Sequence, residues 1–514
     1  MTLPANEYLK RILLAPVYDV AVNSELTKLV TLSAALGNDI YLKREDQQPV
    51  KSFKLRGAYN KLCSLTEQQL QAGVVAASAG NHAQGVAYSA KIKKVQATIV
   101  MPETTPDIKI DAVRRFGGEY AHVVLHGTSF DQAKDEALRL SEVNGYTMVA
   151  PFDDEDVIAG QGTIGRELLE QLPDLDILFI AVGGGGLAAG ISVFLKQLKP
   201  DLKIIAVESD QSACLQAALI AGQPVPLPSV GIFADGVAVK TIGSEPFRLC
   251  QQYVDEVITV TTDEICAAIK DIFDDTRVIA EPAGALSVAG IRKYLQQHSI
   301  EGKKIGGILC GANINFHTLR YVSERCELGE QKEAVFAVKI PERTGAFKQF
   351  CELLGGRTIT EFNYRYASDG EAHIFVGIKL RFGKEEYRQI EHVLTQSGYA
   401  CFDLSENEMA KLHVRYMVGG RPPSLISEHI FSFEFPEYPG ALMKFLETLG
   451  ENWNITLFHY RNHGAAEGLV LAGFEIPTNA RQEFDQHLQK LGYQYSEQTD
   501  NPAYQFFLSG SAST

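Results

Sequence analysis

The sequence predicts an α/β protein in which one large, mostly parallel α/β body is followed by two small α+β modules. Three observations support this prediction. Apolar segments alternate with helical patterns from Ile40 to Asn313, a charged stretch interrupts them near Cys326, and an internal repeat follows. The 514 residues are enough for roughly two to four domains. Hydrophobic residues make up 45% and charged residues 22%, which is typical of globular proteins.

Six apolar, β-rich segments of the body are predicted strands. They are Val74-Ala77, Ala97-Met101, His122-Leu125, Ile177-Val182, Lys203-Val207 and Ile305-Leu309. Helical periodicity fills most intervals between them, for example over 130–143 and 160–172. Strands that alternate with crossover helices form mostly parallel sheets covered on both faces. We therefore expect ligands beyond the carboxyl ends of these strands.

The internal repeat predicts two modules of one kind. Val335-Ala346 aligns with Ile430-Ala441 at an offset of 95, and after one inserted residue Ile359-Thr360 aligns with Ile455-Thr456. Each unit has the pattern of a strand, a Pro/Gly loop, an amphipathic helix and a strand, which is half of a βαββαβ module. The predicted domains are a body over 1–325, a linker over 326–333, and modules over 334–405 and 429–500.

The charge and cysteine content excludes several functions. A net charge of −15 without a basic cluster argues against binding nucleic acid or an anionic membrane. The eight cysteines form no Cys-x-x-Cys pair and no zinc-type spacing, so reduced, mostly buried thiols are expected. No secretory leader or membrane-spanning apolar stretch is evident, which makes the cytoplasm the expected compartment.

Lys54 is the candidate catalytic lysine. It lies in Ser52-Phe53-Lys54-Leu55-Arg56-Gly57, just before a helical pattern that begins near Arg56. A lysine attacks a carbonyl only as the neutral amine, so Schiff-base chemistry needs a lowered lysine pKa. Desolvation, or positive potential from Arg56 or the helix N-terminus, would lower it. A solvated lysine at a helix start is the alternative interpretation.

The second candidate feature is the run of glycines Gly183, Gly184, Gly185 and Gly186, followed by Leu187. It connects a predicted strand to a helix rich in small residues, where backbone N–H groups can converge on a phosphate. The same segment, with Glu208 after the next strand, imitates a dinucleotide-binding fingerprint. On this motif alone a nicotinamide cofactor stays possible in principle, although it leaves the lysine unexplained.

Ser78, Ala79, Gly80 and Asn81 lie between a predicted strand and the helix that begins near His82. The hydroxyl, amide and free N–H groups of such a loop suit a carboxylate or a ring hydroxyl. A plain helix N-cap is the alternative interpretation of this loop. For His82 we expect a structural role.

Together these segments resemble the fold-type II pyridoxal-phosphate enzymes, whose bodies contain two open, mostly parallel α/β subdomains. The whole chain, with its doubled C-terminal module, resembles the biosynthetic threonine dehydratases. The resemblance implies pyridoxal 5′-phosphate as cofactor, Lys54 as the Schiff-base lysine and Asn81 as the partner of the cofactor's 3′-hydroxyl. It also implies that Gly183 to Leu187 bind the phosphate and that Ser78 to His82 bind the substrate carboxylate.

The chain departs from the family pattern at three places. Cys310, in Leu309-Cys310-Gly311-Ala312-Asn313, stands where the biosynthetic members commonly place a serine hydroxyl against the pyridine nitrogen, although a thiol occurs at this place in relatives. A thiol is the weaker hydrogen-bond donor. Ser24-Glu25-Leu26 stands in place of Thr-Pro-Leu, which affects local loop geometry only. Glu208 and Asp235 lie in segments that bind a divalent metal in serine racemases, but Cys214 replaces a carboxylate, so no metal site is expected.

The implied activity is deamination of L-threonine to 2-oxobutanoate and ammonia, the committed step toward isoleucine, with L-serine as an alternative substrate. The modules resemble paired ACT-like regulatory domains, which implies inhibition by isoleucine and relief by valine. The suspected effector loops contain Pro341, Gly345, Ala346, Phe347, Pro436, Gly440, Ala441 and Leu442. A homotetramer is also implied. A nicotinamide-dependent oxidoreductase and a non-catalytic amino-acid sensor are the competing functions.

Overall fold

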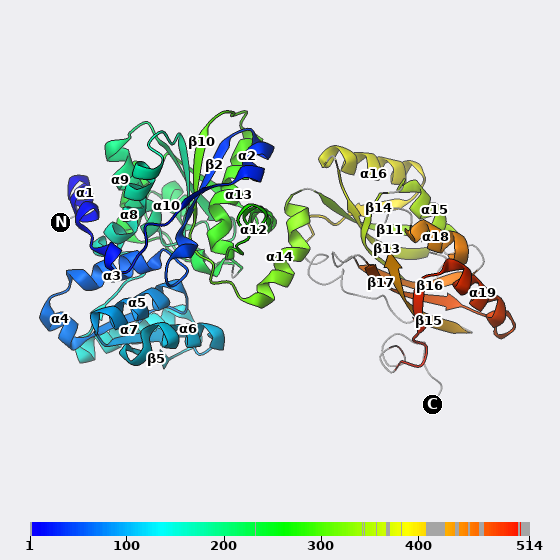
Figure 1. The fold of residues 1–514 in the computed structure, drawn as a ribbon, viewed down its shortest axis with the longest axis horizontal. Helices are drawn as coiled ribbons and strands as arrows, with labels where there is room; N and C mark the ends of the chain where they lie inside the picture. The colour runs from blue at the N-terminus through cyan, green and yellow to red at the C-terminus, as the bar shows by residue number, and fades with distance from the viewer. Residues whose placement is uncertain are drawn as a thin grey trace. The chain divides into compact units, whose positions relative to one another are not determined.

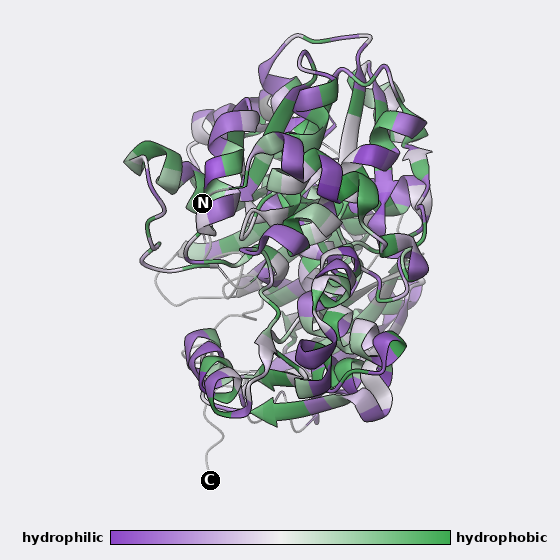
Figure 2. Cartoon of the chain, turned by 90° about the vertical axis from the view of Figure 1, so that its left-hand side faces the viewer, coloured by the Kyte–Doolittle hydropathy of each residue, from purple (hydrophilic) through white to green (hydrophobic). Residues whose placement is uncertain are grey.

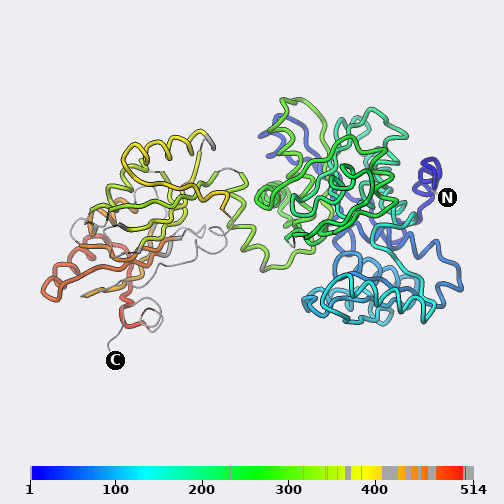
Figure 3. The backbone as a smooth tube through the Cα atoms, turned by 180° about the vertical axis from the view of Figure 1, so that it is seen from behind, coloured from blue at the N-terminus to red at the C-terminus, as the bar shows by residue number. Residues whose placement is uncertain are grey.

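The computed structural model consists of two compact units, residues 1–329 and 330–514 (Figures 1 and 3). It describes residues 3–231, 233–330, 332–341, 343, 345–355, 357–365, 371–381, 383–407, 427–436, 441–450, 453–461, 467–501 and 504. Each unit has its own core and is described by itself. Within the described residues, no helix is both long and apolar enough to span a bilayer.

A six-stranded sheet forms the larger half of the first unit. Its strand order is β1-β2-β10-β7-β8-β9, and only the β1-β2 pair is antiparallel. The strands are β1 (Leu26–Lys28), β2 (Asp39–Arg44), β7 (Ile177–Ala181), β8 (Lys203–Ser209), β9 (Glu256–Val260) and β10 (Lys304–Leu309). The parallel arrangement confirms the predicted fold of the body.

A four-stranded parallel sheet of order β5-β4-β3-β6 forms the smaller half. Its strands are β3 (Val74–Ala77), β4 (Ala97–Met101), β5 (Ala121–Leu125) and β6 (Thr147–Met148). Every side chain of β3 is buried, because helices cover both faces of this sheet. The carboxyl ends of β3 and β10 carry the segments that contain Asn81 and Cys310.

The described residues of the first unit form fourteen α-helices around these strands. They are α1 (Ala5–Leu14), α2 (Val30–Leu36), α3 (Lys54–Ser64), α4 (Glu67–Ala72), α5 (Asn81–Lys93), α6 (Asp107–Gly117), α7 (Phe130–Asn144), α8 (Glu155–Gln171), α9 (Gly186–Leu198), α10 (Cys214–Ala221), α11 (Ser244–Tyr253), α12 (Thr262–Thr276), α13 (Pro282–Gln297) and α14 (Phe316–Gly329). Figure 2 shows hydrophobic strands covered by helices that carry hydrophilic stretches.

A buried ionic cluster joins α3, α8 and β2. Arg56 contacts Glu45 at 2.8 Å and Glu167 at 2.5 Å, and Lys43 contacts Glu167 at 2.6 Å. All four side chains are fully buried. Arg56 therefore lies among carboxylates, and of the alternatives for lowering the pKa of Lys54 it is desolvation, and not positive potential from Arg56, that the structure supports.

The second unit is one eight-stranded sheet of order β14-β11-β13-β12-β16-β17-β15-β18. The first repeat contributes β11 (Glu333–Pro341), α15 (Ala346–Leu353), β12 (Ile359–Arg365), β13 (Glu371–Lys379), α16 (Lys384–Gln396) and β14 (Ala400–Asp403). The second contributes β15 (Glu428–Pro436), α18 (Ala441–Phe445), a π-helical turn (Leu446–Gly450), β16 (Asn454–Arg461), β17 (Glu467–Glu475), α19 (Arg481–Leu491) and β18 (Gln494–Glu497). Both repeats are thus βαββαβ modules, as predicted.

The two repeats pair along equivalent strands. β12 and β16 are antiparallel, with Phe362 opposite Tyr460 and Tyr364 opposite Phe458. One aromatic core extends across this join, where Phe362 and Phe458 have ring centroids 5.9 Å apart. Residues 326–329 of the predicted linker form the last turn of α14, and β11 begins at Glu333, so only 330–332 lie between the elements.

Candidate functional site

One cavity of about 550 Å³ in the first unit contains the predicted site residues of the body. Its lining comes from the carboxyl ends of strands in both sheets, as the parallel topology requires. The predicted residues in the lining are Lys54, Ser78, Ala79, Gly80, Asn81, His82, Gly183, Gly184, Gly185, Gly186, Leu187 and Cys310. The fold therefore brings together segments that are up to 256 positions apart, from Lys54 to Cys310.

Lys54 is the first residue of α3 and is partly buried in the cavity wall. Its Nζ lies 3.5 Å from the carbonyl oxygen of Pro151 and 5.5 Å from the ring centroid of Phe53. Desolvation lowers the pKa of Lys54 to about 8, and the neighbouring Cys310 and Glu281 oppose this shift. A larger fraction of the amine is therefore neutral near physiological pH than for an ordinary lysine, although the protonated form still predominates, and the cause is desolvation and not Arg56.

The chain before Lys54 is tied to the end of β10. Ser52 forms an isolated β-bridge with Gly311, and the Phe53 N–H donates a 3.2 Å hydrogen bond to the Cys310 carbonyl. These contacts fix the start of α3 beside Cys310. The position of the Lys54 side chain therefore depends on the end of β10 as well as on its own helix.

The glycine loop has a conformation that side chains would prevent. Gly185 has φ +89°, which is left-handed and favours glycine. A Cβ on Gly184 would lie 2.1 Å from the ring of Phe152. The loop precedes α9, which begins at Gly186, so free N–H groups of a helix start are available to an anion.

Asn81 is held by two groups that the sequence prediction missed. Its Nδ2 donates a 2.7 Å hydrogen bond to Glu281, and its Oδ1 accepts one of 2.8 Å from Asn313. The Asn313 N–H also donates to Glu281 at 3.1 Å. Burial, then the charge of Asp235, raises the pKa of Glu281 to about 7. Glu281 and Asn313 line the same cavity, so they belong to the site.

A short turn with an internal hydrogen bond precedes α5. The Ser78 hydroxyl accepts a 3.2 Å hydrogen bond from the Gly80 N–H, and α5 begins at Asn81, one residue before the predicted start. His82 is buried, and its Nε2 contacts the Val149 carbonyl at 2.9 Å. Desolvation lowers the pKa of His82 to about 3, so the ring is neutral. Its Nδ1 has no partner within the described residues.

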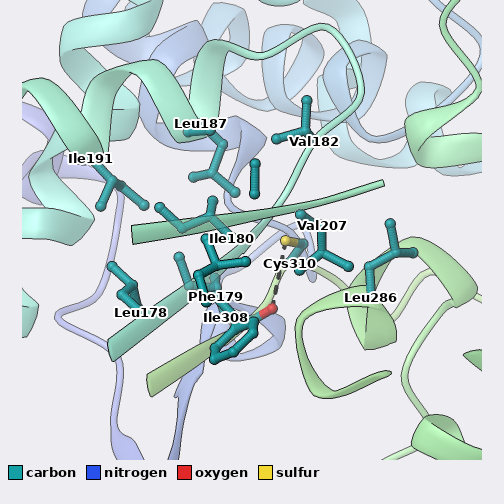
Figure 4. Close-up of a cluster of buried hydrophobic side chains, with 14 of the residues drawn as sticks. Leu178, Phe179, Ile180, Val182, Leu187, Ile191, Val207, Leu286, Ile308 and Cys310 are labelled. Carbon is teal, nitrogen blue, oxygen red and sulfur yellow. Dashed lines mark hydrogen bonds between the residues drawn. The ribbon is translucent and has the colours of Figure 1, made fainter. Parts of the chain in front are cut away.

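Cys310 follows β10 and is buried among apolar side chains of the large sheet (Figure 4). Its Sγ lies 3.6 Å from the Ile308 carbonyl, as the dashed line in Figure 4 marks. Burial raises the pKa of this thiol, so it is protonated and can donate a hydrogen bond. It is one of the lining residues of the cavity.

Glu208 is not placed to bind the ribose of a dinucleotide. It is fully buried, and its two oxygens accept the N–H groups of Leu215 and Gln216 at 2.7 and 2.9 Å. It therefore caps α10, and the dinucleotide interpretation loses its acidic residue. Asp235 lies elsewhere, at the cavity mouth, in an ion pair with Lys109.

The suspected effector loops are only partly described. Gly345 has φ +83° and caps α15, whereas the side chains of Ala346 and Phe347 belong to the core. Pro341 and Pro436 end β11 and β15, Ala441 begins α18, and Leu442 packs against the core. Gly440 lies outside the described residues.

A hollow of about 10 Å³ lies beside the first of these loops. Arg343 and Gly345 of the first repeat and Trp453 and Asn454 of the second line it. Trp453 is 7% exposed, and its Nε1 has no hydrogen-bond partner within the described residues. An amino acid could enter this hollow only after side chains move.

Comparisons with known proteins agree with this geometry. Residues 18–311 match the pyridoxal-phosphate dependent enzyme family. Residues 324–414 and 420–508 match the C-terminal regulatory domain of threonine dehydratase. The biosynthetic L-threonine dehydratase of Escherichia coli (strain K12) is 58% identical over 98% of this chain and 97% of its own length. The chain belongs to the biosynthetic threonine dehydratase family.

Solved structures of related enzymes agree with the fold of this threonine dehydratase. Threonine deaminase isoform 2 of Solanum lycopersicum has a TM-score of 0.61 and 49% identity, covering 62% of this chain and 92% of its own. Serine racemase of Dictyostelium discoideum has a TM-score of 0.56 and 33% identity, covering 60% and 99%. The matches confirm the predicted fold class, cofactor and enzyme class.

The cavity fits pyridoxal phosphate by its own chemistry. It combines a partly neutral amine for an aldehyde, a glycine cradle that a Cβ would fill, and a side-chain amide held in place by Glu281. When bound, this cofactor withdraws electrons from the bond between Cα and its proton. The Nδ1 of the buried His82 ring has no hydrogen-bond partner within the described residues, which leaves it available to a bound group.

Proposed function

We propose that this protein deaminates L-threonine to 2-oxobutanoate and ammonia, with Lys54 as the residue that carries the cofactor and moves the substrate's α-proton. The observation that carries the proposal is the placement of a desolvated lysine in one cavity with the glycine loop and Asn81. L-Serine is the alternative substrate, because one methyl group changes binding by only about 1 to 3 kcal/mol.

The residue roles in this proposal follow from their chemistry. The N–H groups of Gly183 to Leu187 would hold the cofactor phosphate, the Asn81 amide its ring hydroxyl, and the Cys310 thiol its ring nitrogen. Ser78, Ala79, Gly80 and Asn81 would bind the substrate carboxylate at the start of α5, with His82 behind them. As a neutral amine, Lys54 accepts the α-proton. One water molecule is released when the hydroxyl group leaves Cβ, and one water molecule is consumed when ammonia is released. The overall reaction therefore consumes no net water.

The test is a comparison of wild type with Lys54→Ala and Lys54→Arg. We expect wild type to show the violet absorbance band of a lysine-bound cofactor, bleached by borohydride, and to release ammonia from threonine. Both variants should lack the band and turnover. A variant that keeps turnover would refute the role of Lys54, and reduction of a nicotinamide cofactor would favour the oxidoreductase alternative.

We further propose that the repeat binds amino-acid effectors, with isoleucine inhibiting and valine counteracting. Support comes from the match to a threonine dehydratase regulatory domain and from Trp453 Nε1, which lies beside the start of α15 and has no partner among the described residues. An effector carboxylate would favour the helix N-terminus. Isoleucine must bind the less active state better for inhibition to follow.

Truncation after Gly329, the end of α14, tests this assignment. The shortened enzyme should deaminate threonine and no longer respond to isoleucine. Inhibition equal to that of the full chain would place the effector site in the first unit. A silent amino-acid sensor would show neither turnover nor a cofactor band in either form.

Assembly and compartment complete the proposal. A homotetramer is expected by likeness to the family, and sedimentation equilibrium tests it. The cytoplasm is proposed because bacterial relatives such as the Escherichia coli enzyme are this chain's most similar counterparts among those described above. Other relatives are named mitochondrial in Saccharomyces cerevisiae, at 49% identity, and chloroplastic in Solanum lycopersicum, at 47%.

A further inference from the structure

The carbonyl groups of the glycine loop are held by donors that do not line the cavity. The Gly183 carbonyl accepts from the Cys214 thiol at 3.1 Å, and the Gly184 carbonyl accepts from the Gly243 N–H at 3.3 Å. The C=O and N–H of one planar peptide unit point in opposite directions. Holding these carbonyls outward therefore turns the following N–H groups toward the cavity.

Cys214 is itself fixed by a buried carboxylate. It is the first residue of α10, and Glu208 accepts the next two N–H groups of that helix at 2.7 and 2.9 Å. Both Cys214 and Glu208 are fully buried. Glu208 also lies within hydrogen-bonding reach of the thiol. The 3.1 Å contact with the Gly183 carbonyl is the one that joins the thiol to the glycine loop.

We propose that Cys214 is a positioning residue for the phosphate of the cofactor. Its thiol holds the Gly183 carbonyl, and Glu208 holds Cys214, so that the loop keeps its N–H groups aimed at the phosphate. This inference rests on the proposed assignment of Gly183 to Leu187 as the phosphate-binding loop. It explains why a thiol stands at this position without assigning it a metal or a redox role.

The chain offers a matched control for this contact. Cys250 is also buried, at 1% exposure, and lies against the same loop, but its Sγ is 4.0 Å from the Gly185 carbonyl. Replacing either thiol by alanine removes the same atoms from the same region. Only the Cys214 thiol has a hydrogen bond short enough to matter.

The experiment uses the full-length enzyme freed of cofactor and titrated with pyridoxal 5′-phosphate or with pyridoxal, which lacks the phosphate. The variants are Cys214→Ala, Cys214→Ser and Cys250→Ala, and absorbance of the lysine-bound cofactor gives the dissociation constants. Cys214→Val keeps the volume without the donor and takes the place of the alanine variant if that fails to fold.

We expect Cys214→Ala to bind pyridoxal 5′-phosphate about fivefold more weakly, as for one lost hydrogen bond, with pyridoxal binding unchanged. Cys214→Ser should bind as wild type does, and Cys250→Ala should change by less than about twofold. Equal effects of the two alanine variants, or equal losses for both ligands, would overturn the proposal.

The outcome in wild type separates this proposal from the one it rests on. Equal affinity for the two ligands would show that the loop does not bind the phosphate and would overturn both. A wild-type preference for the phosphate, with unchanged binding by Cys214→Ala, would overturn the role of Cys214 alone and leave the loop assignment in place.

Discussion

Asn81 and Glu281 are 200 positions apart in the chain and share a 2.7 Å hydrogen bond. Since Asn313 contacts both, the amide of Asn81 has one orientation in the cavity wall. The orientation of Asn81, the residue that we propose binds the ring hydroxyl of the cofactor, is therefore set by residues from the last third of the first unit.

Replacing Glu281 should weaken cofactor binding. Glu281→Ala leaves the Asn81 amide and the Asn313 N–H without their acceptor, and we expect about tenfold lower affinity for pyridoxal 5′-phosphate. Glu281→Gln keeps one oxygen for Asn81 and serves as the control, with a smaller loss. Titration of the cofactor-free enzyme measures both. Unchanged affinity of the alanine variant would mean that Asn81 needs no support.

Lys54→Met should stabilise the cofactor-free enzyme at pH 7. The pKa of Lys54 is about 8 in the fold against 10.5 for the ordinary group. At pH 7 the lysine is protonated in both states, so the full cost of burying its charge is present. We expect about 2 kcal/mol, discounted for water in the cavity.

The advantage of Lys54→Met should shrink as the pH rises from 8 to 10.5, because the folded lysine loses its proton before the unfolded one. Urea unfolding at several pH values measures the difference between the two proteins. A difference that grows with pH would have the wrong sign and would show that Lys54 is solvated.

Glu167→Gln should destabilise the first unit strongly. It leaves Arg56 and Lys43 buried with one carboxylate fewer, which costs about 3 to 5 kcal/mol. Glu170→Gln on the same helix breaks only an exposed pair with Arg166, and we expect less than about 1 kcal/mol. The urea midpoints of the two variants test this contrast. Similar midpoints would show that water reaches the buried cluster.

Gly184→Ala should damage the phosphate loop, since the new Cβ would lie 2.1 Å from Phe152. We expect at least about tenfold weaker binding of pyridoxal 5′-phosphate, as overpacking typically costs 1–3 kcal/mol. Gly165→Ala, where the nearest atom is 3.4 Å away, is the matched control and should bind normally. Normal binding by both variants would argue against the loop assignment.

Trp453→Phe should reduce sensitivity to isoleucine. In the wild type the indole and Phe484 have ring centroids 5.3 Å apart; the variant keeps an aromatic ring there and removes the Nε1 donor, which has no partner in the part of the chain that the structure describes. We expect about fivefold more isoleucine for half inhibition, equivalent to one hydrogen bond, with unchanged activity in its absence. Inhibition curves at fixed threonine give the answer. An unshifted curve would remove Trp453 from the effector site.

Much of the fold could be predicted from local patterns. Strands β3, β4, β7, β8 and β10 are apolar runs because both of their faces are covered, and such runs stand out in a sequence. β9 was missed because most of Glu256–Val260 is only half buried, and β6 because it has two residues. The repeat revealed the second unit because its two halves kept the same pattern.

The surroundings of the site residues could not be predicted in the same way. Arg56 follows Lys54 by two positions, yet its partner Glu167 is 111 positions from it. The sequence shows the proximity of Arg56 but not the carboxylates that neutralise it. Glu281 was missed for the same reason, since nothing near it in sequence indicates that it accepts from Asn81.

The antiparallel pairing of β12 with β16 has a consequence for how the second unit can be used. Each repeat alone would expose the edge of that strand and half of the aromatic core that Phe362 and Phe458 share. The repeats should therefore melt in a single cooperative transition, and neither could be grafted onto another enzyme without its twin. The smallest regulatory unit that could be transferred to another enzyme is therefore the pair of repeats.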